Sequence, residues 1–358
     1  KILQDKCYQN RTLLYLQILY IKEAVEFLKR SELSDICVFI NIDSRISRMP
    51  DLFSKDTIAF VESIKDYISR ICIVLPQDEI SLETSDINAL FGFFNSNGFK
   101  IAIDDFGSGS FSHRHLYELM PDFVKLDRFF IDDLEKHIRK KLYVSNICSI
   151  TKVLGIRMIA KGIDTKGLYY TIKELGIPLL EGKMVSGDIH DIDKIKDRYR
   201  HIEKLHLKDK RDSHKNSLKE YIEYLSPVYE NEEMQDVLEK FRKNKDSTFL
   251  PVVDMTSYPI GIIKDKDLKD FVYSTYGTAL LKNKSAVKNV RQFVSKCGIT
   301  DINSDIDEVL NIFSISQDGN GVVVVKDNKY IGFLSSTSLL NALNRKNLIN
   351  ALISSFSF

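Results

Sequence analysis

The sequence predicts an α/β fold in which an incomplete (β/α)8 barrel precedes a smaller α+β region. Up to residue 187, short apolar runs alternate with amphipathic segments, a pattern typical of βα units and a parallel sheet. Over residues 216–345 the pattern changes to a unit that occurs twice. At 358 residues the chain is also long for a single hydrophobic core, so we expect more than one domain.

The barrel region contains six runs that are short and apolar enough to be strands. They cover residues 36–42, 71–75, 99–104, 122–127, 156–160 and 177–182. Apolar residues at i, i+3 and i+4 spacing predict helices between them, at 12–30, 56–69, 135–153 and 167–175. A closed barrel of this kind has eight strands. One or two strands are therefore missing from the N-terminal end, unrecognised in the sequence, or absent from the fold.

A strongly charged stretch at 188–215 follows the barrel region, and its thin apolar stripe predicts a connecting helix and a linker. The same stripe would also suit a helix that pairs two subunits. In the repeated region, residues 247–271 match 321–343, and an amphipathic helix precedes each copy. The two units are expected at about 216–284 and 285–345, with 346–358 as a C-terminal tail.

Composition excludes several classes of protein. Lys and Arg number 51 and Asp and Glu number 50, so the net charge of +1 gives no electrostatic footprint for nucleic acid. The five cysteines are scattered and form no CxxC pair, which argues against a disulfide framework and a zinc site and favours the cytoplasm. No run approaches the roughly 20 apolar residues that a transmembrane segment needs.

Residues 101–127 carry the chemistry-bearing side chains. One predicted strand delivers Asp104 and Asp105 into a glycine-containing turn, and the next delivers Lys125 and Asp127. Because the strands of such a barrel end at one shared mouth, these groups can converge on a metal ion and a phosphate. The alternative is a solvated acidic turn, in which Asp105 caps a helix and the glycines at 107 and 109 supply positive φ.

Several motifs in this region resemble the EAL domain of bacterial cyclic di-GMP phosphodiesterases. They are IDDFGSG, VKLD, INIDS and IAKGIDT, in the order and at about the spacing of that family, with LPQDEI and LLEGKM at two further motif positions. The resemblance implies a TIM-like barrel that holds two Mg²⁺ or Mn²⁺ ions and opens cyclic di-GMP to a linear dinucleotide. The repeated region resembles a tandem pair of CBS domains, of the type found between EAL and GGDEF domains.

The resemblance assigns site residues position by position. Matching positions are Asn41, Asp104 and Asp105 at the metal site, and Lys125 and Asp127 among the catalytic residues. Asp164, a third catalytic position, conservatively replaces a glutamate. Departing positions are Val74 and Gln77 in place of two glutamates, Lys161 in place of a glutamate near the attacking water, and Glu181 in place of a glutamine. A register slip to Asp78 or Glu79 leaves the position of Gln77 open. The glutamate of the EAL tripeptide and a GGDEF domain have no counterpart, so whether the chain is a fragment stays open.

These departures predict a degenerate, vestigial site. Two dications need several carboxylates, and an ammonium at position 161 would repel them. We therefore expect no firmly bound cofactor, although one weakly held Mg²⁺ or Mn²⁺ at Asn41, Asp104 and Asp105 stays open. The alternative that we favour is an ion pair of Asp104 with Lys125 or Lys161.

The CBS-like repeats are incomplete in the same way. In that family a hydroxyl residue contacts the phosphate of an adenine nucleotide, and an Asp three positions later contacts the ribose. The first repeat has Lys264 and Asp267 at these positions, and the second has Ser335 and Ser338. Neither repeat has the full pair, so nucleotide binding and a purely structural, dimer-forming role both stay open.

The sequence thus favours a non-catalytic signalling or regulatory protein of the cyclic di-GMP type. It would combine a degenerate EAL barrel with a CBS regulatory or dimerisation module, as a homodimer in the bacterial cytoplasm. One alternative is an active Mg²⁺- or Mn²⁺-dependent cyclic di-GMP phosphodiesterase. Another is a receptor that binds cyclic di-GMP without turnover.

Overall fold

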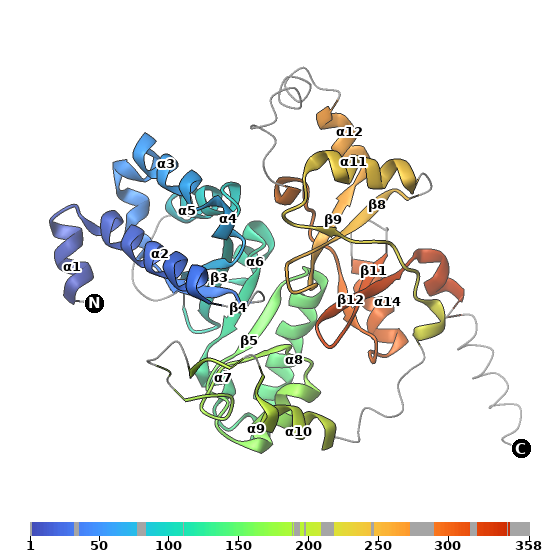
Figure 1. The fold of residues 1–358 in the computed structure, drawn as a ribbon. Coiled ribbons are helices and arrows are strands. Elements are labelled where there is room, and N and C mark those ends of the chain that lie inside the picture. Colours follow the sequence, from blue (N-terminus) through green and yellow to red (C-terminus); the bar gives the residue numbers. More distant parts are fainter. Residues whose placement is uncertain are drawn as a thin grey trace, which may run out of the picture. The chain divides into compact units, whose positions relative to one another are not determined.

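The computed structural model divides the chain into two compact units, drawn in Figure 1. The first comprises residues 1–148 and 156–199, and the second comprises residues 149–155 and 200–358. The structure describes residues 2–31, 36–76, 84–109, 111–187, 189, 194–196, 198–208, 218–244, 247–272, 290–315, 321–341 and 343. The predicted C-terminal tail at 346–358 therefore lies outside the described residues, as does much of the charged stretch.

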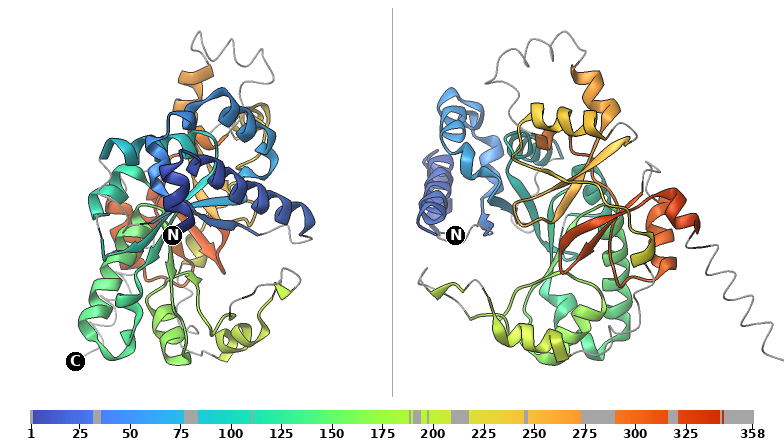
Figure 2. Two further views of the ribbon diagram at one scale, coloured as in Figure 1. Left: turned by 90° about the vertical axis from the view of Figure 1, so that its left-hand side faces the viewer. Right: turned by 45° about the vertical axis from the view of Figure 1, so that its right-hand side comes forward.

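The first unit contains one six-stranded sheet, and every neighbouring pair of its strands is parallel. The strands follow one another in chain order: β1 (Val38–Asn41), β2 (Ile71–Leu75), β3 (Lys100–Phe106), β4 (Phe123–Leu126), β5 (Arg157–Ala160) and β6 (Leu179–Leu180). The sheet curls into a half-barrel, which can be followed in Figures 1 and 2. The predicted α/β barrel fold and all six of its strands are confirmed; β2 has the predicted bounds, β3 extends two residues further, to Phe106, and the other four strands are shorter than predicted.

Helices connect these strands, as the apolar spacing predicts. The α-helices are α1 (Ile2–Gln9), α2 (Leu13–Arg30), α3 (Lys55–Ser63), α4 (Lys65–Ile68), α5 (Thr84–Ser96), α6 (His113–Leu119), α7 (Arg128–Ile131), α8 (Ile138–Val153) and α9 (Lys166–Glu174). Short 3₁₀ helices are η1 (Ser44–Arg48), η2 (Pro50–Phe53) and η3 (Leu134–Lys136). On α2 the buried residues Leu14, Ile21, Val25 and Leu28 share one face, which packs into the main core.

Burial distinguishes the inner strands of the sheet from its edge. All five residues of β2 are buried, as expected for a parallel strand that is covered on both faces. In β1, by contrast, Phe39 and Asn41 are exposed. The inward face of the sheet carries a separate apolar cluster that includes Cys72, Val74 and Phe123. These strands fix the positions of the side chains that follow their carboxyl ends.

The second unit contains two three-stranded sheets, one for each sequence repeat. The elements before and in the first repeat are α10 (Arg200–Lys208), η6 (Lys219–Tyr221), β7 (Val228–Tyr229), α11 (Met234–Lys243), β8 (Phe249–Val253), β9 (Pro259–Lys264) and α12 (Asp265–Val272). The second repeat contains η7 (Val290–Phe293), β10 (Ile299–Asp301), α14 (Ile306–Ile315), β11 (Val322–Lys326) and β12 (Lys329–Leu334), followed by a helix at 336–341. The repeated strand, strand, helix pattern is confirmed.

The sequence analysis missed one strand in each repeat. β7 pairs in parallel with β8, and β10 pairs in parallel with β11, ahead of the helix that we took to begin each unit. β7 has two residues and β10 has three, which is too short to show the alternation that predicts a strand. The hairpin between β11 and β12 turns at Asp327 and Asn328, both at positive φ, as a tight hairpin turn requires.

The segment that leads into each repeat pairs with the other repeat. Glu223 forms an antiparallel bridge with Phe333 of the second sheet, and Ser295 forms one with Ile262 of the first. Glycine permits both approaches: a Cβ on Gly332 would lie 2.5 Å from the Glu223 carbonyl oxygen, and one on Gly261 would lie 2.3 Å from that of Ser295. The two repeats are therefore bound together by their own lead-in segments.

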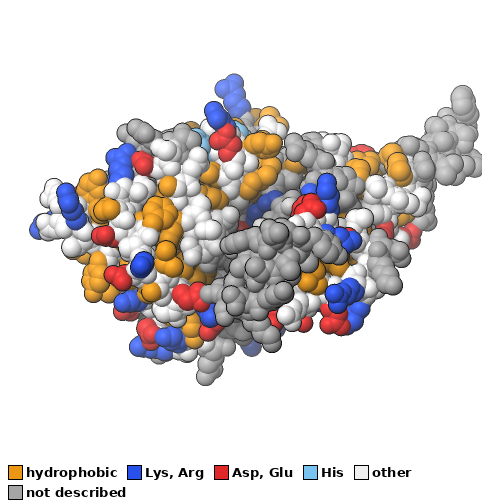
Figure 3. All heavy atoms as spheres, turned by 90° about the horizontal axis from the view of Figure 1, so that it is seen from above, with side chains coloured by type: hydrophobic (Ala, Val, Ile, Leu, Met, Phe, Trp, Pro, Cys, Tyr) orange, Lys and Arg blue, Asp and Glu red, His pale blue; other side chains and the backbone are white. Residues whose placement is uncertain are grey.

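On the face drawn in Figure 3, basic and acidic side chains are interspersed among small apolar groups. This agrees with the net charge of +1. In the part of the chain that the structure describes, no helix is both long and apolar enough to cross a membrane.

We expect Gly332→Ala to destabilise the protein by more than about 1 kcal/mol, because the new methyl group would meet the Glu223 carbonyl and Gly332 has φ +152°. Gly92→Ala is the control, since Gly92 lies within α5 with no atom within 4 Å of a new Cβ. It should be neutral or stabilising by about 0.5–1 kcal/mol. Thermal unfolding followed by circular dichroism measures both, and equal melting temperatures for the two variants would contradict the expectation.

Candidate functional site

The carboxylates of the candidate site lie in an irregular part of β3. Pairing with β4 is regular at Ile103 and resumes at Phe106, with a register shift at the two residues between them, Asp104 and Asp105. Asp105 has φ +47°, and its backbone N–H donates to the Asp104 carboxylate over 2.9 Å. Irregular strand positions of this kind are often found beside active sites, because they redirect a side chain.

The turn after β3 differs from the solvated-turn alternative. Asp105 does not cap a helix, because α6 begins at His113 and its N-terminal capping contacts come from Ser112 and His115. Gly107 has the positive φ that was expected, whereas the residue at 109 is not among the positive-φ residues of the described chain. A Cβ on Gly107 would lie 2.5 Å from the Phe130 ring, so close packing also requires glycine there.

The two aspartates share one cation, which is the Lys161 ammonium. Lys161 follows β5 directly, and its Nζ lies 2.8 Å from Oδ1 of Asp104 and 2.5 Å from Oδ1 of Asp105. The side chains are 20%, 16% and 39% exposed for Lys161, Asp104 and Asp105 respectively. Burial lowers the pKa of Lys161, but the hydrogen bonds to the two carboxylates outweigh burial and raise that pKa above its usual value. Lys161 is therefore a stable ammonium at neutral pH.

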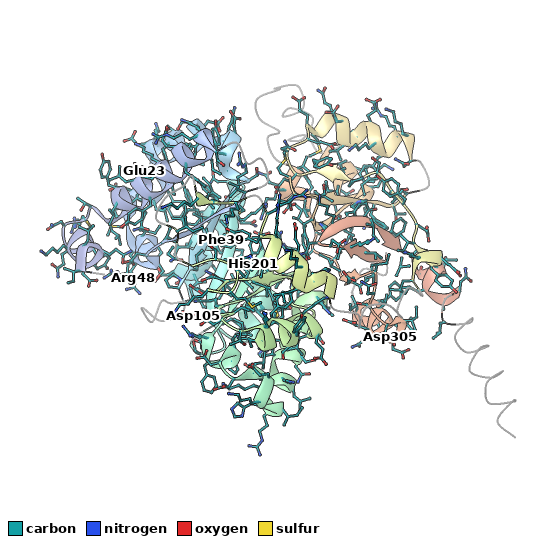
Figure 4. The ribbon with its side chains drawn as sticks, turned by 60° about the horizontal axis from the view of Figure 1, so that its bottom comes forward. Glu23, Phe39, Arg48, Asp105, His201 and Asp305 are labelled. Atoms are coloured by element: carbon teal, nitrogen blue, oxygen red, sulfur yellow. The ribbon has the colours of Figure 1, made fainter. Side chains whose placement is uncertain are left out.

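Lys125 forms a second ion pair at the same end of the sheet. Its Nζ lies 2.9 Å from Oε2 of Glu181 and 5.9 Å from the centre of the Phe39 ring. Figure 4 labels Phe39 and Asp105, which come from the first and third strands of this sheet. Of the two partners predicted for Asp104, the structure selects Lys161, and Lys125 instead neutralises the acid that replaces a glutamine of the motif.

The remaining motif residues have local structural contacts. Asp127 caps α7, where its carboxylate accepts from the Phe129 N–H over 2.6 Å. Asp164 accepts from the Lys183 backbone N–H over 3.1 Å, and its carboxylate lies 3.5 Å from the Arg128 guanidinium. These contacts fix the loops after β4 and β5.

Asn41 and Val74 pair with each other in neighbouring strands. Asn41 is exposed at the end of β1, whereas Val74 is 1% exposed and belongs to the apolar cluster inside the half-barrel. The strand position at which the resemblance predicts a metal-binding glutamate therefore carries a buried apolar side chain. Gln77, with the alternative positions Asp78 and Glu79, lies outside the described residues.

The described side chains of this site are arranged as an ion bridge. Among the described residues, no group of three or more His, Cys, Asp and Glu lies where it could hold a metal ion. The ammonium of Lys161 contacts both carboxylates, and it would repel a dication placed beside them. The geometry supports an internal ion bridge rather than a metal site.

In the second unit, the candidate residues of the two repeats lie at equivalent places. Lys264 ends β9 and Asp267 lies in α12, whereas Ser335 follows β12 and Ser338 lies in the helix at 336–341. The sequence analysis missed Glu223, whose Oε1 accepts hydrogen bonds from the hydroxyls of both Ser335 and Ser338. No local motif marks Glu223, because it lies 112 positions before Ser335.

Comparison with protein families agrees with this geometry. A model of the EAL domain matches residues 9–188, which is about half of the chain. The chain belongs to the EAL domain family. A model of the CBS domain matches residues 223–274 of this EAL protein, within the second unit. The resemblance to the EAL domain is therefore confirmed, as is the resemblance to a CBS domain over residues 223–274.

Relatives of this EAL protein include cyclic di-GMP phosphodiesterases. It is 28% identical over 124 residues to the probable cyclic di-GMP phosphodiesterase PdeA of Escherichia coli (strain K12), which covers 33% of this chain and 17% of that protein. It is 33% identical over 85 residues to the cyclic di-GMP phosphodiesterase PdeB of Shewanella oneidensis, covering 24% and 10%. The chain thus matches less than a fifth of either relative.

One solved structure among those that resemble the chain is the PaMucR phosphodiesterase in complex with c-di-GMP. The match has 19% sequence identity and a TM-score of 0.45, and it covers 51% of this chain and 75% of that one.

We expect Lys161→Met to lower the stability of the first unit by on the order of 1 kcal/mol, because two adjacent carboxylates lose their counter-ion in a partly exposed setting. Added Mn²⁺ should then raise the melting temperature of this variant, since the freed carboxylates can hold a cation, and should leave the wild type unchanged. Differential scanning fluorimetry with and without Mn²⁺ measures both effects.

Lys183→Met is the matched control, because it removes an exposed lysine from the loop after β6 without touching the bridge. It should melt like the wild type. A wild-type protein stabilised by Mn²⁺ as strongly as Lys161→Met would contradict the view that the ammonium occupies the cation position.

Proposed function

We propose that this EAL protein is a non-catalytic signalling or regulatory protein of the cyclic di-GMP type, in which the CBS unit is the regulatory or dimerisation module. The observation that carries the proposal is the Lys161 ammonium, which holds Asp104 and Asp105 in a closed ion bridge. Phosphodiester hydrolysis by two metal ions needs cations that activate water and stabilise the transferring phosphoryl oxygens. The bridge occupies the carboxylates that such ions would use.

The protonation state of Lys161 supports the same conclusion. A general base must give up its proton near neutral pH, and the carboxylates hold the pKa of Lys161 above its usual value. Lys161 therefore cannot replace the glutamate of the motif as an acceptor of a proton from water. Val74 is buried and apolar, so it supplies no ligand either.

Two further observations support a structural use of the retained motif residues. Lys125 is neutralised by Glu181, and Asp127 caps α7. Each retained charge that the catalytic reaction would need has a partner within the protein. A substrate would have to displace these partners before it could use the charges.

The decisive experiment is incubation of the purified chain with cyclic di-GMP and Mg²⁺ or Mn²⁺, followed by chromatography of the products. We expect no linear dinucleotide under conditions in which an active EAL phosphodiesterase converts the substrate completely. Asp104→Ala is the matched control, because turnover by a contaminating enzyme would persist in this variant.

Metal-dependent turnover that chelation abolishes and Asp104→Ala removes would overturn the proposal. Titration calorimetry with cyclic di-GMP on the same sample then specifies the non-catalytic function. Binding without turnover identifies a receptor, and absence of heat favours a ligand or partner other than cyclic di-GMP.

A further inference from the structure

Two hydroxyl groups of the second repeat converge on one carboxylate oxygen. The hydroxyls of Ser335 and Ser338 both donate to Oε1 of Glu223. The two hydroxyl oxygens lie 3.1 Å apart, and the Ser338 backbone N–H donates to the Ser335 hydroxyl oxygen over 3.1 Å. The two hydroxyl donors therefore share an anionic acceptor that belongs to the protein itself.

The backbone fixes Glu223 at this place. Its N–H and carbonyl exchange two hydrogen bonds of 2.8 Å with Phe333. The absence of a side chain at Gly332 lets the Glu223 carbonyl approach the strand. Two residues further on, the Tyr330 hydroxyl donates to the Leu225 carbonyl oxygen over 3.0 Å. The carboxylate is thus positioned by a paired strand segment, although the side chain itself is exposed.

The first repeat offers an internal comparison, because its corresponding residues carry different charges. Gly261 corresponds to Gly332, so that Lys264 stands for Ser335 and Asp267 for Ser338. Ser295 stands for Glu223, since each bridges the residue after the glycine. The first repeat therefore has a neutral residue at the bridging position and a cation at the end of its strand. The second repeat has a carboxylate at the bridging position and no cation among these three residues.

We propose that Glu223 is a tethered anion that keeps phosphate-bearing ligands out of the second repeat. A phosphate needs hydrogen-bond donors, and the two hydroxyls that would serve already donate to Glu223. Its negative charge would also lie within a few ångströms of the carboxylate and be repelled by it. Glu223 thereby makes the two repeats differ in their affinity for phosphate. The second repeat does not bind phosphate while the Glu223 carboxylate is present.

The experiment removes the carboxylate and measures a gain of binding. In the full chain, Lys264→Ala removes the cation that would bind phosphate in the first repeat. Calorimetry with AMP, and separately with inorganic phosphate, then reports on binding to the second repeat. We expect no heat from Lys264→Ala alone at millimolar ligand. The double variant Lys264→Ala/Glu223→Gln should bind at least about tenfold more tightly, which corresponds to removal of about 1.4 kcal/mol of repulsion.

Matched controls separate this effect from a general change of charge. Glu220→Gln in the same background removes an exposed carboxylate three positions earlier and should give no gain. Ser335→Ala added to the double variant should abolish the gain, because it removes one of the two donors. Glu223→Ala provides a second test with a smaller side chain, and unchanged melting temperatures show that each variant is folded.

Binding of AMP or phosphate by Lys264→Ala as tight as by the double variant would overturn the proposal. Failure of both folded Glu223 variants to gain binding would overturn it as well. Neither outcome depends on cyclic di-GMP, so this result and the test of the non-catalytic function are independent.

Discussion

The ion bridge from Lys161 to Asp104 and Asp105 determines what the mouth of the half-barrel can do. The two aspartates leave β3 at consecutive positions, one of them at positive φ, so their carboxylates lie close together in a partly buried place. Two adjacent carboxylates need a cation, because otherwise one of them would be driven to take up a proton. Here the cation is the ammonium of Lys161, which belongs to the same chain and directly follows β5. In the sheet, β4 lies between β5 and β3, the strand that carries the two aspartates.

The substitutions in the motifs are coupled through charge. An acid at position 161 would add a third carboxylate beside Asp104 and Asp105, whereas the lysine neutralises them. Glu181, in place of a neutral glutamine, similarly neutralises Lys125. Each change therefore creates an ion pair with a motif residue, and these ion pairs give the motif residues a structural role. For this reason the intact DDFG turn identifies the family but is weak evidence for the reaction.

Sequence alone predicted the features that depend on residues close to one another in the chain. Buried parallel strands are continuous apolar runs, so all six strands of the half-barrel were predicted. An ion pair of Asp104 with either Lys125 or Lys161 was also predicted. β7 and β10 were missed because two or three residues show no period. Glu223 was missed because its partners lie more than a hundred positions away and no spacing rule connects them. The choice of Lys161 rather than Lys125 required the register of the sheet, which sequence alone leaves open.

In each unit a charged side chain of the protein itself occupies the candidate site, and the sign of its charge differs between the two units. Lys161 places a tethered cation between two carboxylates, and Glu223 places a tethered carboxylate between two hydroxyls. A tethered group competes at an effective concentration in the millimolar range or above, which free cations and phosphates must exceed before they displace it. Occupation of these places therefore depends little on the surrounding concentration of metal or nucleotide.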